Sequence, residues 1–92
     1  MTQNDLFAND APVRSGWVVT CGEADRSGNV SLLKDNFIGE GVFYLIFPSQ
    51  AAADREAKAM NRLRSGMKLE EIYKVAKLRP EWVDGLPCRR VH

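Results

Sequence analysis

FIGEGVFYLIF, residues Phe37–Phe47, is the most strand-like stretch of the chain and decides its fold class. Successive strand residues point to opposite sides, so the apolar run in its second half places apolar side chains on both faces. Such a strand lies at the centre of a sheet or under a helix. Gly39 and Gly41, on either side of Glu40, predict a bulge or bend in its first half.

Two shorter strands are predicted before this segment. Trp17–Cys21 is rich in β-branched and aromatic residues, and Val30–Leu33 is a short apolar run. Between them, Gly22–Asn29 is rich in residues that favour a tight reversal, and Lys34–Asn36 carries a second turn signal. The first half of the chain therefore predicts three strands joined by turns.

Helix-forming residues dominate after Pro48. Ser49 is a good N-cap for a helix over residues 50–65, and Gly66 is a natural stop. A second helix is predicted over Lys68–Lys77, because apolar residues recur there at the spacing of one helix face. The residues of this predicted apolar stripe are Leu69, Ile72, Tyr73 and Ala76.

The remaining residues predict one helical turn over Pro80–Asp84, with Trp82 pointing inward, and a short strand over Cys88–Val91. The order of elements is then β-β-β-α-α-β. This order is typical of an α+β fold in which two helices pack on one face of a small antiparallel sheet of three to four strands. We interpret residues 1–15 as a flexible N-terminal arm and residues 16–92 as a single α+β domain.

Composition excludes several classes of protein. With 92 residues the chain builds one modest core, and no apolar run approaches the roughly 20 residues of a membrane span. The first residues lack the basic start and apolar stretch of a signal peptide, so we expect a cytoplasmic protein. Two cysteines and one histidine do not supply a zinc site, and no catalytic set is recognisable. We therefore expect a non-enzymatic protein with no metal, cofactor or membrane partner.

The arm contains one short motif, Gln3-Asn4-Asp5-Leu6-Phe7. It resembles the pentapeptide by which bacterial polymerases and repair factors dock on the replicative sliding clamp. The resemblance implies that Gln3 anchors the motif through its amide and that Asp5 takes the third, often acidic, place. It also implies that Leu6 and Phe7 fill an apolar pocket of the clamp. Asn4 departs from the leucine that is common at the second place.

Two adjacent large apolar residues in a polar arm are also typical of a linear peptide that becomes ordered in a partner's groove. We therefore predict a small protein-binding, regulatory protein, with the bacterial sliding clamp as its candidate partner. The alternative is that Leu6 and Phe7 fold back over the domain's own sheet. A further hypothesis is a protein inhibitor or accessory subunit of phage or plasmid origin.

The charge distribution leaves another function open. Residues 1–46 hold three basic and six acidic residues, whereas residues 47–92 hold ten basic and six acidic residues. A basic C-terminal half is compatible with a nucleic-acid-binding module, although dedicated DNA-binding domains carry a larger basic surplus. The candidate nucleic-acid-binding residues are Arg62, Arg64, Lys68, Arg89 and Arg90.

The sequence around the two cysteines does not indicate a catalytic role for either thiol. Cys21 lies in an apolar run and is expected to pack as a small hydrophobe. Cys88 precedes Arg89 and Arg90, which are expected to lower the pKa of its thiol somewhat. No catalytic partner for this thiol is visible in the sequence.

Overall fold

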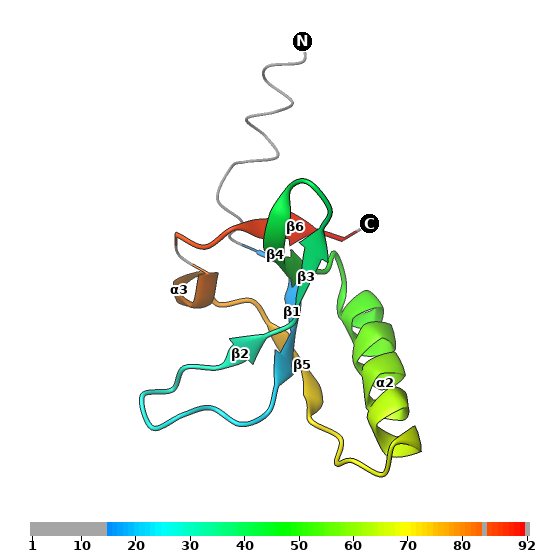
Figure 1. Ribbon diagram of the computed structural model, residues 1–92. Coiled ribbons are helices and arrows are strands. Elements are labelled where there is room, and N and C mark those ends of the chain that lie inside the picture. Colours follow the sequence, from blue (N-terminus) through cyan, green and yellow to red (C-terminus); the bar gives the residue numbers. More distant parts are fainter. Residues whose placement is uncertain (1–14, 84, 92) are drawn as a thin grey trace.

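The computed structural model describes residues 15–83 and 85–91 of the chain (Figure 1). The elements, in chain order, are β1 (Trp17–Cys21), β2 (Ser31–Leu32), β3 (Lys34–Phe37), β4 (Gly41–Ile46), α2 (Gln50–Gly66), β5 (Tyr73–Lys77), α3 (Pro80–Val83) and β6 (Cys88–Arg90). The strands form two three-stranded sheets, one with the order β2-β1-β5 and the other with the order β3-β4-β6.

The two sheets differ in the direction of their strands. β1 pairs antiparallel with β2 on one edge and with β5 on the other, where Trp17 faces Lys77. β3 and β4 form an antiparallel hairpin. β6 lies parallel to β4, with Tyr44 opposite Cys88. The second sheet therefore combines a local hairpin with a strand from far along the sequence.

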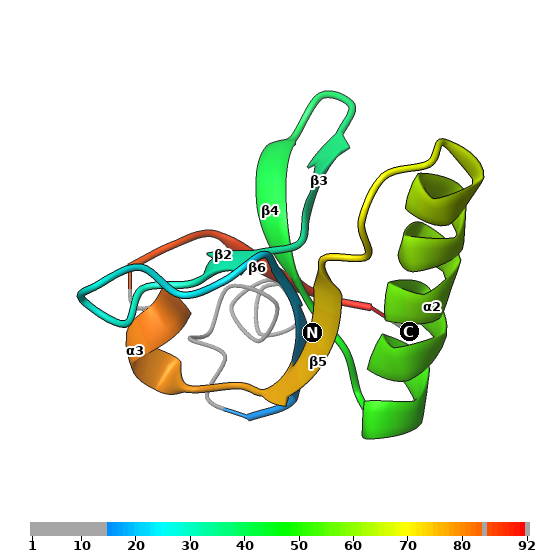
Figure 2. The same ribbon diagram turned by 90° about the horizontal axis from the view of Figure 1, so that it is seen from below.

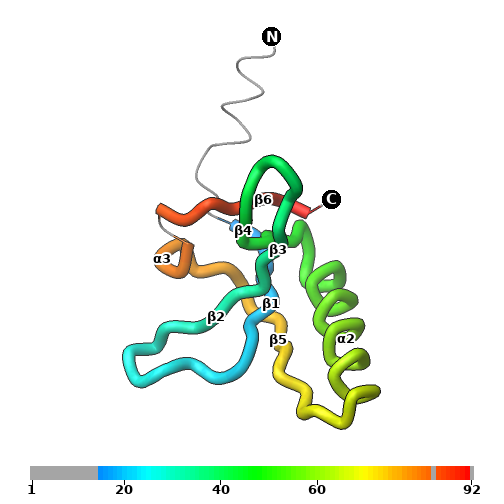
Figure 3. Tube along the Cα trace, viewed as in Figure 1, coloured from blue at the N-terminus to red at the C-terminus, as the bar shows by residue number. Residues whose placement is uncertain are grey.

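Hydrogen bonds join the two sheets where β1 begins and β4 ends. Trp17 N donates to Phe47 O at 2.9 Å, and Phe47 N donates to Trp17 O at 2.7 Å. Leu33, between β2 and β3, makes a second link, because its N–H donates to Val19 O and its carbonyl accepts from Leu45 N. Hydrogen bonds therefore connect the first four strands across both sheets. The tube in Figure 3 shows the course of the chain through these strands.

Strand β1 divides the core into two apolar clusters, because Val18 and Val19 are fully buried and point to opposite faces. On the Val19 side, Ala53 and Ala57 of α2 are buried, and their small side chains let the helix lie close to β1 and β5. Figure 2 shows α2 and α3 on opposite sides of these two strands. The buried members are Val18, Leu32, Ile46, Leu78 and Val83 in one cluster, and Val19, Phe47, Ala53 and Ala57 in the other.

The fold is α+β as predicted, but the prediction of a single sheet with two helices on one face is wrong. The observed order is β-β-β-β-α-β-α-β, in place of β-β-β-α-α-β. The physical reason is the two-sided burial of β1. Each of its faces needs a separate apolar cover, and one helix lies over each.

The predicted helix over Lys68–Lys77 is also wrong, because this segment forms a loop followed by β5. Asn61 of α2 holds the start of the strand. Its Oδ1 accepts from the N–H groups of Ile72 (3.1 Å) and Tyr73 (3.0 Å), and its Nδ2 donates to Tyr73 O at 2.9 Å. Lys68 adopts the left-handed region with φ 61°, which interrupts helical geometry. The backbone N–H and C=O groups of Tyr73–Lys77 then form hydrogen bonds with β1, although the spacing of the apolar residues in this segment also fits a helix.

The turn predicted at Lys34–Asn36 belongs to strand β3 instead. The reversal lies at residues 38–40, where Glu40 N donates to Phe37 O at 2.8 Å and Gly39 has φ 81°. Of the two glycines that were predicted to bend one long strand, Gly39 lies in the turn of a hairpin and Gly41 is the first residue of β4.

Several local predictions are confirmed. They are β1, the long helix, the helical turn from Pro80 and the short strand from Cys88. Ser49 caps α2, since its Oγ accepts from Ala52 N at 3.1 Å. Gly66 is the last residue of the helix, and Met67 is its C-cap.

Adding a side chain at Gly16 tests how closely the two sheets approach each other at their junction. It has φ 138°, and a Cβ at this position would lie 2.6 Å from Ile46 Cγ2 and 3.1 Å from Phe47 O. We expect Gly16→Ala to lower the free energy of unfolding by about 3 kcal/mol, through backbone strain and overpacking together. Gly28→Ala is the matched control, because Gly28 has φ 82° but no neighbour within 4 Å, and should cost about 1 kcal/mol. Chemical denaturation measures both, and equal costs would contradict the close approach at Gly16.

Candidate functional site

The β3–β4 hairpin carries two exposed apolar side chains. Ile38, in the turn, is 98% exposed, and Val42, in β4, is 48% exposed. In Figure 2 this hairpin extends away from β1, β5 and α3. We call Ile38 and Val42 the hairpin tip. An exposed apolar pair on a projecting hairpin is a candidate contact surface, provided that the hairpin is held in one orientation.

Arg89 of β6 supplies that restraint. Its Nη1 and Nη2 donate to the two carboxylate oxygens of Glu40 at 3.1 and 2.6 Å. Its guanidinium also lies over the rings of Phe37 and Phe43, 4.2 and 4.5 Å from their centroids. The two rings meet edge to face with their centroids 5.6 Å apart. We call these four residues the arginine brace. A planar fork that both pairs and stacks fixes geometry in a way that a lysine does not.

The brace also changes the proton affinity of its two charged groups. Hydrogen bonds from Arg89 and its positive charge hold the pKa of Glu40 below the usual value. The same hydrogen bonds raise the pKa of Arg89. A carboxyl group whose pKa is lowered by folding stabilises the fold above its ordinary pKa, and this contribution is lost as the pH falls through the lowered value. The brace is therefore formed at neutral pH and is lost only in acid.

A second group of exposed apolar side chains lies where α2 ends and in the loop that follows. Leu63 is 65% exposed and Met67 is 69% exposed, and Leu69 lies two residues further along the chain. Arg64 Nε donates to Glu70 O at 2.6 Å and ties the loop to the helix. This apolar group is therefore also presented by a segment with its own anchoring hydrogen bond.

The five basic residues predicted to bind nucleic acid do not form one surface. Arg62, Arg64 and Lys68 lie at or just after the end of α2, whereas Arg89 and Arg90 belong to β6, and Figures 1 and 2 both show these two regions well apart. Arg64 and Arg89 each donate to an oxygen of the protein itself. The predicted basic set is therefore divided into two groups, and each group has one member already engaged.

Both cysteines are free thiols, each half-buried. Burial raises the pKa of the Cys21 thiol and of the Cys88 thiol. The expectation that Arg89 and Arg90 lower the pKa of Cys88 is therefore wrong. Arg89 points to the face of β6 opposite Cys88 and pairs with a carboxylate instead. At neutral pH these thiols are protonated and are poor nucleophiles.

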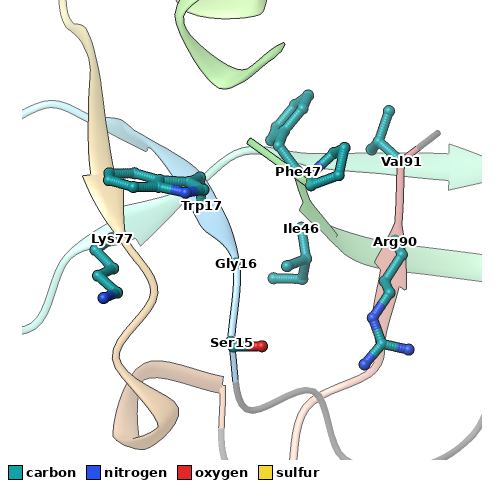
Figure 4. Close-up of a pocket in the computed structure, with 9 residues that line it drawn as sticks. Ser15, Gly16, Trp17, Ile46, Phe47, Lys77, Arg90 and Val91 are labelled. Atoms are coloured by element: carbon teal, nitrogen blue, oxygen red, sulfur yellow. The ribbon is translucent and has the colours of Figure 1, made fainter. Parts of the chain in front are cut away.

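A pocket of about 430 Å³ opens where β1 begins and where β4 and β6 end (Figure 4). Ile46 and Phe47, which are both buried, form part of its lining. Lys77 and Arg90 lie on opposite sides of the pocket, and the Ser15 hydroxyl lies between them. The pocket is separate from the arginine brace, since the two share no residue.

The residues of the clamp-binding motif, Gln3, Asp5, Leu6 and Phe7, lie outside the described residues, as do all but the last residue of the predicted arm over residues 1–15. Docking on the clamp and the alternative of packing on the domain's own sheet therefore both stay predictions from the sequence.

Two other features concern only the part of the chain that the structure describes. Neither helix there has the length and apolar character to cross a membrane. Within residues 15–83 and 85–91, no three side chains of His, Cys, Asp or Glu gather as they would around a metal ion.

Comparison of the chain with protein-family models, with curated proteins and with solved structures finds no match in any of the three. Any function is therefore inferred from the chemistry of the surfaces described above.

Sequence reasoning missed the arginine brace and Lys77 of the pocket, and it assigned Arg90 to a nucleic-acid-binding set instead of to the pocket. Glu40 and Arg89 are 49 positions apart, and no local pattern links them. Ile38 did carry a signal, since a large apolar residue beside Gly39 in a turn has no neighbour to cover it, but it was included in one long strand. Lys77 carried no signal in the sequence, because its place beside the pocket depends on the pairing of β5 with β1.

The arginine brace predicts an acid transition confined to the hairpin. In the wild type, the ring signals of Phe37 and Phe43 should stay constant from neutral pH downward and shift only at a pH below the ordinary pKa of a glutamate, because Arg89 lowers the pKa of Glu40. Glu40→Gln should place these signals near their acid positions already at pH 7 and abolish the transition. NMR spectra recorded across a pH series measure both effects. Glu23→Gln, in the exposed β1–β2 loop, is the control and should leave the transition intact. An unchanged transition in Glu40→Gln would contradict this role of Glu40.

Proposed function

We propose that this protein is a small, non-catalytic, protein-binding protein that regulates its partners. The observation that carries the proposal is the hairpin tip, where Ile38 is 98% exposed on a hairpin restrained by the arginine brace. Burying a large apolar side chain that has no cover in its own fold gains about 1.5–3 kcal/mol when a partner covers it.

The brace favours such binding because the hairpin is already ordered before contact. Immobilising a side chain at an interface costs about 0.5–1.5 kcal/mol, and a surface that is ordered in the free protein avoids part of that cost. The bidentate contact of Arg89 with Glu40 and its stacking on two rings provide this order during folding. Val42 adds a second exposed apolar side chain to the same hairpin. An inhibitor or accessory subunit of phage or plasmid origin would use the same surface.

The bacterial sliding clamp is the partner that we propose for the N-terminal motif. Gln3 would anchor the peptide and Asp5 would occupy its third place. Leu6 and Phe7 would fill the apolar pocket. A short peptide that becomes ordered on binding suits micromolar affinity, roughly −8 kcal/mol. The motif and the hairpin tip are different surfaces, so the protein would connect the clamp to a second protein.

A nucleic-acid-binding function has less support. Arg64 and Arg89 donate to oxygens of the protein itself, and the other predicted basic residues are divided between two distant elements. Phosphate binding draws on several cations along one surface. The described arrangement therefore favours a protein partner.

Clamp docking predicts a specific pattern of binding for the wild type and two variants. The labelled full-length protein should bind purified bacterial sliding clamp with a Kd on the order of micromolar, measured by fluorescence anisotropy. The double variant Leu6→Ala, Phe7→Ala should bind at least roughly tenfold more weakly, because it loses both apolar anchors. Asn4→Ala is the matched control within the motif and should bind like the wild type. Equal binding by all three proteins, or none by the wild type, would exclude clamp docking.

The hairpin tip makes a second, independent prediction. A photo-crosslinking amino acid placed at Ile38 should give a covalent adduct with a specific protein in bacterial cells, identified by mass spectrometry. The same group at Ser27, in the exposed β1–β2 loop, should not give this adduct. Adding Arg89→Lys to the Ile38 probe should reduce the yield, because lysine keeps the charge but loses the fork that restrains the hairpin. Identical adducts from positions 38 and 27 would contradict a contact surface at the hairpin tip.

A further inference from the structure

Two positively charged residues line the pocket where β1 begins. Lys77 of β5 and Arg90 of β6 stand on either side, with the Ser15 hydroxyl between them (Figure 4). None of the described residues that line it is acidic. Among the described ion pairs, none involves either of these two cations. Two cations beside one pocket, with no carboxylate among its described lining residues, create a positive potential that attracts an anion.

The interior of the same pocket is apolar. Trp17 and Val91, which are both half-buried, line it together with Ile46, Phe47 and Pro48. Its volume of about 430 Å³ falls in the range of small-molecule sites, roughly 300–1,000 Å³. A pocket that is lined by both apolar residues and two cations matches a ligand that has an apolar body and one anionic end.

Backbone hydrogen bonds fix the walls of the pocket. Trp17 and Phe47 exchange two of them, Leu78 N donates to Gly16 O at 3.0 Å, and Val91 N donates to Ile46 O at 2.8 Å. The pocket is therefore formed by the fold itself, and a ligand does not have to order it.

We propose that this pocket binds a small amphipathic carboxylate. Its apolar tail lies against the half-buried side chains of Trp17 and Val91, and its carboxylate lies between Lys77 and Arg90. The guanidinium fork of Arg90 matches the two oxygens of a carboxylate, and Lys77 adds a second charge. This site shares no residue with the hairpin tip or the N-terminal motif, so it goes beyond the proposed function and is tested separately.

Titration of the full-length protein with decanoate, below its micelle concentration, tests the proposal. The indole N–H signal of Trp17 should shift in NMR spectra, and calorimetry should give a saturable Kd. Lys77→Gln and Arg90→Gln should each weaken binding by roughly fivefold, because each loses one charged contact at a partly exposed site. Lys74→Gln, an exposed lysine on the same strand but outside the pocket, is the matched control and should bind like the wild type. Decanol, which has the same chain without the charge, should bind more weakly than decanoate.

Four results would overturn the proposal. They are no saturable binding of decanoate, equal binding of decanoate and decanol, equal affinity of all three charge variants, and tighter binding of decyl phosphate than of decanoate. The variant Leu6→Ala, Phe7→Ala provides one more test. If it binds decanoate whereas the wild type does not, the natural occupant is the protein's own N-terminal segment, and the proposal of a carboxylate ligand is wrong.

Discussion

The pair of hydrogen bonds between Trp17 and Phe47 is the constraint on which the rest of the structure depends. It joins the first strand of one sheet to the end of the central strand of the other. The junction requires Gly16, because a Cβ at that position would overlap with Ile46. Both faces of β1 are then covered, one by each apolar cluster. The same close approach forms the wall of the pocket, so one backbone contact determines both the core and a candidate ligand site.

The sequence predicted elements that form from local information. β1, α2 with its Ser49 cap, the turn at Pro80 and the strand at Cys88 depend on neighbouring residues and were predicted at the right places. β5 was not, because its apolar residues fit a helix as well as a strand. Its conformation is decided by pairing with β1 and by the Asn61 amide. These contacts bring together residues distant in sequence, which periodicity does not report.

The candidate sites likewise divide into those that a local sequence pattern indicates and those that only the fold brings together. The N-terminal motif is a sequence pattern and could be recognised without a structure. The arginine brace could not, since Glu40 and Arg89 meet only when β6 lies beside β4. The predicted basic residues share a charge but not a location, and the fold separates those of α2 from those of β6. Composition therefore indicated which side chains were available, whereas topology decided which of them act together.

The parallel pairing of β4 with β6 has a consequence for biosynthesis. The hairpin of β3 and β4 is synthesised first, whereas Arg89, which restrains it, and Val91, which bonds to Ile46, are added more than 40 residues later. While translation continues, Phe37 and Phe43 lack their guanidinium partner, and one edge of β4 is unpaired. Strand edges and apolar surface left open in this way are the features that chaperones recognise and that promote aggregation. The nascent chain therefore passes through a vulnerable interval that ends only when β6 pairs with β4.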